Sequence, residues 1–156
     1  MTLSLTEYAG WLYGQPGIEA LLLELQDQQG ADVLLLLLAC WLGRTAVPAD
    51  SALWQTLHAQ QTPWRQQVID PLRQVRRSLA TNSQAAALYQ QVKACELASE
   101  WYQLEQLEML CRSFIKPQAS KSWQNAMLAH LSLASGASDT RGLTALVELA
   151  VAAEKG

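Results

Sequence analysis

The stretch ADVLLLLLACWLG, residues 31–43, decides the fold of this chain of 156 residues. Its centre, residues 33–42, carries no charge and no polar group stronger than a thiol or an indole N–H. A helix needs about 20 apolar residues to cross a bilayer, and a run of about 10–14 is more typical of a buried helix. A longer span that included the preceding segment would place Glu24, Asp27 and Asp32 in lipid, at a cost of several kcal/mol. We therefore expect no membrane span here.

Capping residues at both ends indicate a central helix over residues 32–42. Asp32 is a good N-cap, and Gly43 is a good residue just beyond a helix C-terminus. The helix is apolar on every side, and such a helix lies in the middle of a globule with neighbours all round. A buried strand is the weaker alternative, because Leu and Ala dominate the run and Val occurs once.

The rest of the chain also predicts helices and no sheet. Leu, Ala and Gln are abundant and suit helices, and alternation of period two is absent. The helices we expect are 6–13 with Thr6 as its cap, 17–28, 32–42, 51–60, 63–80, 84–112, 121–134 and 140–154. Pro71 should kink or split helix 63–80, which should form an antiparallel hairpin with helix 84–112. The prediction is one all-α domain over residues 1–156, a compact bundle of about six to eight helices around the buried apolar helix.

Charge and cysteine usage restrict the class of partner and the compartment. The chain has 11 basic and 14 acidic residues, a net charge of −3, which argues against nucleic acid as a partner. Cys40, Cys95 and Cys111 form no C-x-x-C pair, and the N-terminus lacks the pattern of a secretory leader. We expect a reducing, cytoplasmic location.

Motifs for catalysis and metal binding are absent from the sequence. His58 and His130 lie far apart, and neither has a Glu or Cys partner four residues away. No G-x-S-x-G motif and no glycine-rich phosphate loop occurs. We therefore expect no metal, no cofactor and no catalytic residue, and a binding function in preference to an enzymatic one.

The basic stretch WRQQVIDPLRQVRR, residues 64–77, is the strongest local signal of function. On a helix, three of its arginines fall within roughly 80° of arc and the fourth lies further round. Guanidinium groups bind carboxylate and phosphate in a bidentate manner, and Trp with Arg is typical of binding hot spots. Our first hypothesis is a non-enzymatic cytosolic interaction module that binds an acidic protein or a phosphate-bearing partner. Its partner-binding residues would be Trp64, Arg65, Arg73, Arg76 and Arg77.

A plainer interpretation of the same stretch is a solvated helix face. Charge runs on helices usually lie at the surface. The arginines would then pair in part with carboxylates of the neighbouring helix, namely Glu96, Glu100, Glu105 and Glu108.

A second hypothesis places an enzyme or small-ligand pocket at the corner between residues 13 and 32. Tyr13, Asp27 and Asp32 would line it beside arginines, because Asp27 and Asp32 flank Gly30. Paired carboxylates serve acid–base chemistry. The alternative is that Asp32 only caps its helix while Asp27 is solvated or pairs with an arginine.

Two segments carry a resemblance to a known family. They are LYGQPGIEALLLELQDQQGADVLLLLLACWLG at 12–43 and WRQQVIDPLRQVRR at 64–77. In them the chain resembles a proteobacterial family of small all-helical cytosolic proteins of unknown function. Members often carry an asparagine after the Asp–Val pair, where this chain has Leu34, so that polar group is missing here. The resemblance implies a helical fold and a bacterial cytoplasm, and it implies no activity.

Overall fold

The structure is all-helical, as the sequence predicts. It is a computed structural model that describes residues 3–115, 123–137 and 139–156, and this part of the chain contains no strand. The N-terminal helices are α1 (Leu5–Tyr13), α2 (Ile18–Gln29), α3 (Val33–Arg44) and α4 (Ser51–Trp64). They are followed by a π-helical segment, η1 (Arg65–Ile69), by α5 (Asp70–Leu79) and by a 3-10 turn, η2 (Ser83–Ala85). The remaining elements are α6 (Ala86–Cys111), the 3-10 turn η3 (Arg112–Phe114), α7 (Trp123–Ser135) and α8 (Arg141–Lys155).

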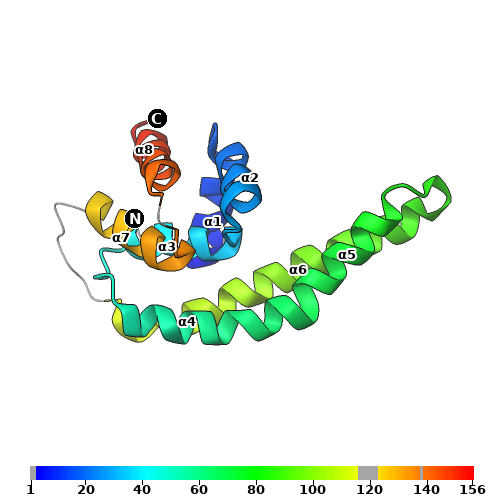
Figure 1. The fold of residues 1–156 in the computed structure, drawn as a ribbon, viewed down its shortest axis with the longest axis horizontal. Coiled ribbons are helices and arrows are strands. Elements are labelled where there is room, and N and C mark those ends of the chain that lie inside the picture. The colour runs from blue at the N-terminus through cyan, green and yellow to red at the C-terminus, as the bar shows by residue number, and fades with distance from the viewer. Residues whose placement is uncertain (1–2, 116–122, 138) are drawn as a thin grey trace.

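The apolar stretch forms the central helix. Every residue of α3 from Leu35 to Gly43 is buried, and helices α1, α2, α6 and α7 pack around it (Figure 1). Asp32 is the N-cap of α3, and its carboxylate accepts a hydrogen bond from the backbone N–H of Leu35 at 3.2 Å. Within the described ranges no helix is long and apolar enough to span a membrane.

Helix α7 crosses α3 at Gly43, and this close approach needs a glycine. A Cβ built on Gly43 would lie 2.3 Å from the Cα of Met127. Because the obstacle is backbone, no rotamer change could relieve the clash. The expectation that Gly43 lies just beyond the end of this helix is wrong, since α3 continues to Arg44 and Thr45 is its C-cap. Gly43 lies inside α3, where it sets the distance between the two helices of the core.

The two prolines of residues 51–79 lie within one continuous helical rod. The expected break between residues 60 and 63 is wrong, since Pro63 lies inside α4. At Pro71 the expected disturbance takes the form of η1, where the N–H of Asp70 donates to the carbonyl of Arg65. Pro71 has no N–H to donate, and its ring crowds the carbonyl four residues earlier, so the turn before it widens. Figure 1 shows the rod changing direction between α4 and α5.

The expected antiparallel hairpin is confirmed, with α5 packed against α6. Its outer part extends away from the other helices (Figure 1), and no residue of α5 is buried. One smaller expectation is wrong: the first helix is capped by Ser4, not Thr6, in a capping box with Glu7. Of the helix expected over 121–134, residues 121 and 122 lie outside the described ranges.

Candidate functional site

The site begins at the N-terminus of α3, where Asp32 does more than cap the helix. Gly30 ends α2 in the left-handed conformation, with φ of 65°, and so turns the chain toward α3. One carboxylate oxygen of Asp32 caps α3, and the other accepts a hydrogen bond of 2.8 Å from the side-chain amide of buried Gln61. Asp32 thus holds the start of α3 against α4.

Arg65 opens the π-helical segment and faces Asp32. Its guanidinium lies 3.6 Å from the Asp32 carboxylate and 3.9 Å from that of Asp70. Both distances exceed hydrogen-bonding range. In the part of the chain that the structure describes, the guanidinium of Arg65 makes no hydrogen bond, although its side chain is only about one-third exposed (32%).

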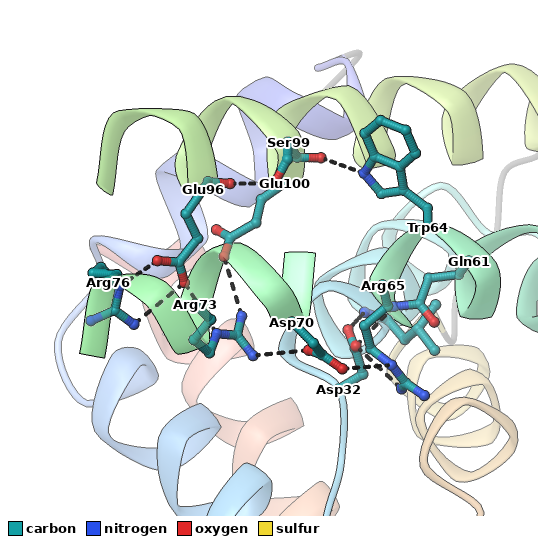
Figure 2. A network of polar contacts seen from close by, with 11 residues as sticks. Asp32, Gln61, Trp64, Arg65, Asp70, Arg73, Arg76, Glu96, Ser99 and Glu100 are labelled. Atoms are coloured by element: carbon teal, nitrogen blue, oxygen red, sulfur yellow. Dashed lines mark hydrogen bonds and ion pairs between the residues drawn. The ribbon is translucent and has the colours of Figure 1, made fainter. Parts of the chain in front are cut away.

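Arg73, by contrast, is firmly held by α6. It donates hydrogen bonds to Glu96 at 3.1 Å and to Glu100 at 3.2 Å, and its other terminal nitrogen lies 3.8 Å from Asp70 (Figure 2). Arg76 also donates to Glu96. The interpretation of the arginines as partly paired with α6 therefore describes Arg73 and Arg76 well.

The two carboxylates of α6 respond differently to this environment. Burial acts to raise the pKa of Glu96, but the hydrogen bonds from Arg76 and Arg73 hold it below its usual value. The pKa of Glu100 is raised, chiefly by burial, with Glu96 and Asp32 adding to the effect and Arg73 opposing it. Glu100 therefore takes up a proton more readily than Glu96.

These groups line a cavity of about 330 Å³, which we call the polar cavity. It lies between the C-terminus of α2, the N-terminus of α3, η1, α5 and α6. Its polar lining residues are Gln26, Asp32, Arg65, Asp70, Arg73 and Glu100. Because positive and negative groups alternate around it, the cavity suits a polar ligand that replaces one of the internal ion-pair partners.

A second cavity of about 350 Å³, the apolar groove, lies beside the first between α1, α3 and α6. Its lining includes Gly10, Tyr13, Leu34, Leu97, Trp101 and Leu104. Tyr13 is at its edge, and its hydroxyl donates to Glu19 at 3.3 Å. The groove is therefore lined mainly by apolar side chains.

The structure rearranges the two predicted groups of site residues. Arg65 and Arg73 from the basic stretch and Asp32 from the corner line the same polar cavity. Tyr13 lines the apolar groove instead, and Asp27 is exposed and lines neither cavity. The corner residues thus do not converge as a set.

The other members of the basic stretch lie outside the polar cavity. Trp64 packs on the ring of Tyr102, with 4.7 Å between ring centroids, and donates to the backbone carbonyl of Ser99. Arg77 is exposed and forms no ion pair within the described residues. Trp64 thus joins α4 to α6, and Arg77 is the arginine of the stretch that faces solvent.

Three polar lining residues of the polar cavity are not among the predicted site residues: Gln26, Asp70 and Glu100. The sequence marks Asp70 as the acid among the arginines and Glu100 as a pairing partner on the next helix, but neither pattern indicates a cavity. The contact of α2 with this region depends on how the helices pack, so no local pattern points to Gln26.

Histidines and cysteines take no part in the site. His130 is buried, accepts a hydrogen bond of 3.0 Å from the indole N–H of Trp54 and lies 2.6 Å from the carbonyl of Val47. Cys40 and Cys111 are buried and Cys95 is exposed, all three as free thiols. Among the described residues no cluster of three or more His, Cys, Asp or Glu could hold a metal ion.

Comparison with known proteins identifies a family. A family model described as "Protein of unknown function (DUF2390)" matches residues 4–107, which are two-thirds of the chain and include every residue that lines the two cavities. The chain belongs to this family, which agrees with the resemblance to a family of unknown function. No curated protein and no solved structure matches the chain.

Proposed function

We propose that this member of the DUF2390 family is a non-enzymatic binding protein whose polar cavity takes a small ligand with a carboxylate or phosphate group. One observation carries the proposal. Arg65 lies in the cavity wall with its guanidinium close to two carboxylates, yet it hydrogen-bonds to neither within the described residues. A guanidinium in a partly enclosed site binds strongly to an acid that reaches hydrogen-bonding distance.

The position between Arg65 and Arg73 is where the acid group would lie. Asp70 now occupies it loosely, at 3.9 Å from one guanidinium and 3.8 Å from the other, with its side chain about half exposed (49%). A ligand acid could displace Asp70 toward solvent and bind both arginines.

Binding fits the lining better than catalysis does. The described residues that line the polar cavity include no Ser, Cys or His that could act as a nucleophile or as a base near neutral pH. The carboxylates present are engaged as a helix cap or as arginine partners. We therefore assign the site to recognition of a ligand.

The test is calorimetric titration of the intact chain with inorganic phosphate and with acetate. Arg65→Gln should weaken binding roughly tenfold or more, because a hydrogen bond to a charged group contributes about 1.5–3 kcal/mol. Arg141→Gln is the matched control, since Arg141 is an exposed arginine that pairs locally with Asp139. Equal affinities for Arg65→Gln and Arg141→Gln, or no binding of either anion, would contradict the proposal.

A second candidate is the acidic macromolecular partner, and one observation favours it. Arg77 lies exposed and unpaired, among the described residues, on a hairpin that extends away from the other helices. Such a partner would contact Arg76 and Arg77 at the end of α5. It would also contact Trp64, Arg65 and Arg73, which lie nearer to the helices packed around α3. Arg77→Gln should then weaken binding to polyglutamate or polyphosphate in a salt-dependent manner, and it should leave binding of small anions in the cavity unchanged.

We also propose that the protein comes from a proteobacterium and is located in the cytoplasm. The resemblance of residues 12–43 and 64–77 supports the source. Three free cysteines, one of them exposed, fit a reducing compartment.

A further inference from the structure

The polar cavity and the apolar groove share two wall residues. Leu34, in the first turn of α3, and Glu100, on α6, line both. The two spaces are therefore neighbours on either side of these side chains. A molecule that passes between Leu34 and Glu100 moves from a lining of charged groups to one of hydrocarbon.

The apolar groove has the features of a site for a chain of hydrocarbon. Leu97 on its wall is half exposed (52%), so part of its apolar surface has no partner in the described structure. Gly10 on α1 adds no side chain, and a Cβ placed there would meet the Trp101 ring only at 3.6 Å. Burial of an apolar chain against these side chains would remove hydrocarbon from water on both partners.

Size also favours use of the two spaces together. The volumes are about 330 and 350 Å³, and each lies near the lower end of the roughly 300–1,000 Å³ typical of ligand sites. A free small anion fills the polar cavity only. A ligand with a polar head and an apolar tail uses both.

We infer that the ligand is an amphiphile, with an acid headgroup between Arg65 and Arg73 and an unbranched apolar tail that passes Leu34 and Glu100 into the apolar groove. The inference rests on the proposed function for its headgroup and goes beyond it in the tail. The acid is a carboxylate or a phosphate, the two groups that a pair of guanidinium groups recognises. Glu100 at the boundary, with its pKa raised by burial, presents a carboxyl that becomes neutral more easily than that of Glu96.

The experiment is calorimetric titration of the full chain with acetate, butyrate, hexanoate, octanoate and decanoate. Alkyl phosphates of matched length and inorganic phosphate form the second arm, which separates carboxylate from phosphate recognition. Affinity should rise roughly three- to fourfold for each methylene that enters the groove, the factor that corresponds to burial of one CH₂. Decanol, which has the tail without the acid, should bind far more weakly than decanoate.

Gly10→Leu should abolish the chain-length dependence, because its side chain fills the groove, while it leaves binding of acetate or phosphate unchanged. Gly14→Leu is the matched control: Gly14 is also an exposed glycine of the α1 surface with a negative φ, and it does not line the groove. Leu97→Ser is a second variant that should fold normally because Leu97 is half exposed, and it should reduce the affinity for decanoate severalfold.

Each outcome separates the inference from the proposed function. Binding of acetate or phosphate that depends on Arg65 but does not change with chain length would overturn the amphiphile and leave the proposed function intact. No binding of any acid, short or long, would overturn both. Equal affinities for decanol and decanoate, both unaffected by Arg65→Gln, would show that the site does not recognise an acid. That result would overturn the acid headgroup in the inference and in the proposed function.

Discussion

Helix α3 and the α5–α6 hairpin form equally regular helices, but different forces hold them in place. From Leu35 to Gly43, α3 is buried on all sides, and its neighbours contact it through hydrocarbon. Helix α5 has no buried residue and is tied to α6 by ion pairs from Arg73 and Arg76 to Glu96 and Glu100. Packing of apolar side chains depends on their volume and not on charge, whereas partly exposed ion pairs depend on charge and little on volume. The helices packed around α3, which we call the body, should therefore be sensitive to changes in side-chain volume. The hairpin should be sensitive to changes in charge.

The largest effect should come from adding one methyl group in the body. Gly43→Ala places a Cβ 2.3 Å from the Cα of Met127, so α7 must move away from α3. We expect the free energy of unfolding to fall by about 3 kcal/mol or more, at the upper end for overpacked cores. Urea denaturation followed by circular dichroism measures this.

The matched control for that variant is Gly142→Ala on α8. Its Cβ would meet the end of the Leu25 side chain at 2.6 Å, and a flexible side chain can turn aside. The loss should therefore be smaller than for Gly43→Ala. A loss at position 142 that equals the loss at position 43 would mean that the α3–α7 crossing is not the tightest part of the body.

A charge deletion in the hairpin should have a smaller and local effect. Glu96→Ala removes the carboxylate that Arg73 and Arg76 share, and the Glu96 side chain is only 8% exposed. We expect a loss of about 1–2 kcal/mol, less than for a fully buried pair because both arginines are about one-quarter exposed and water screens them. Hydrogen exchange should speed up in α5 and the outer part of α6 and stay unchanged in α3 and α7.

The control for this variant is Glu105→Ala, an exposed glutamate on the same helix, which should change stability very little. The pH dependence gives a second check. The pKa of Glu96 is lowered in the folded state, so the unfolded chain takes up the proton first as the pH falls. The stabilisation by Glu96 is present above about pH 4.5 and is lost below it. Faster exchange in α3 as well would show that body and hairpin are not independent.

The smallest effect should be a pH dependence of the body that arises from His130. His130 is neutral when folded, since it accepts from Trp54, and burial lowers its pKa although the contact with Val47 acts against this. The unfolded chain binds a proton near pH 6.5 and the folded chain only at lower pH. Stability should therefore fall as the pH drops below about 6.5, by at most about 1.4 kcal/mol per pH unit.

His130→Gln should flatten this part of the stability curve between pH 7 and pH 5, and His58→Gln serves as the control at the other histidine. Urea denaturation at a series of pH values measures the effect. A slope that persists in His130→Gln would assign the pH dependence to another group.

Much of the candidate site could be predicted residue by residue but not as an assembly. Asp32 was expected as a cap, and it is one. Of the four carboxylates expected to pair with the arginines, Glu96 and Glu100 do so. Among the described residues Glu108 pairs with Arg112 instead, and Glu105 is exposed. The second hypothesis places Asp32 beside arginines, and it lies there, but the sequence does not indicate that these are Arg65 and Arg73, because they lie in segments far from Asp32 that meet it only through tertiary packing.

The sequence by itself determined the all-helical class, the enclosed helix at 33–42 and the helix ends set by Asp32 and Gly30. These depend on interactions within one or two turns, namely capping, the apolar period and backbone conformation. Only the tertiary structure decided that Pro63 stays inside a helix and that the polar cavity adjoins the apolar groove. The free energy of a helix kink or a cavity wall depends on which distant side chains fill the space around it, and a local pattern does not contain that information.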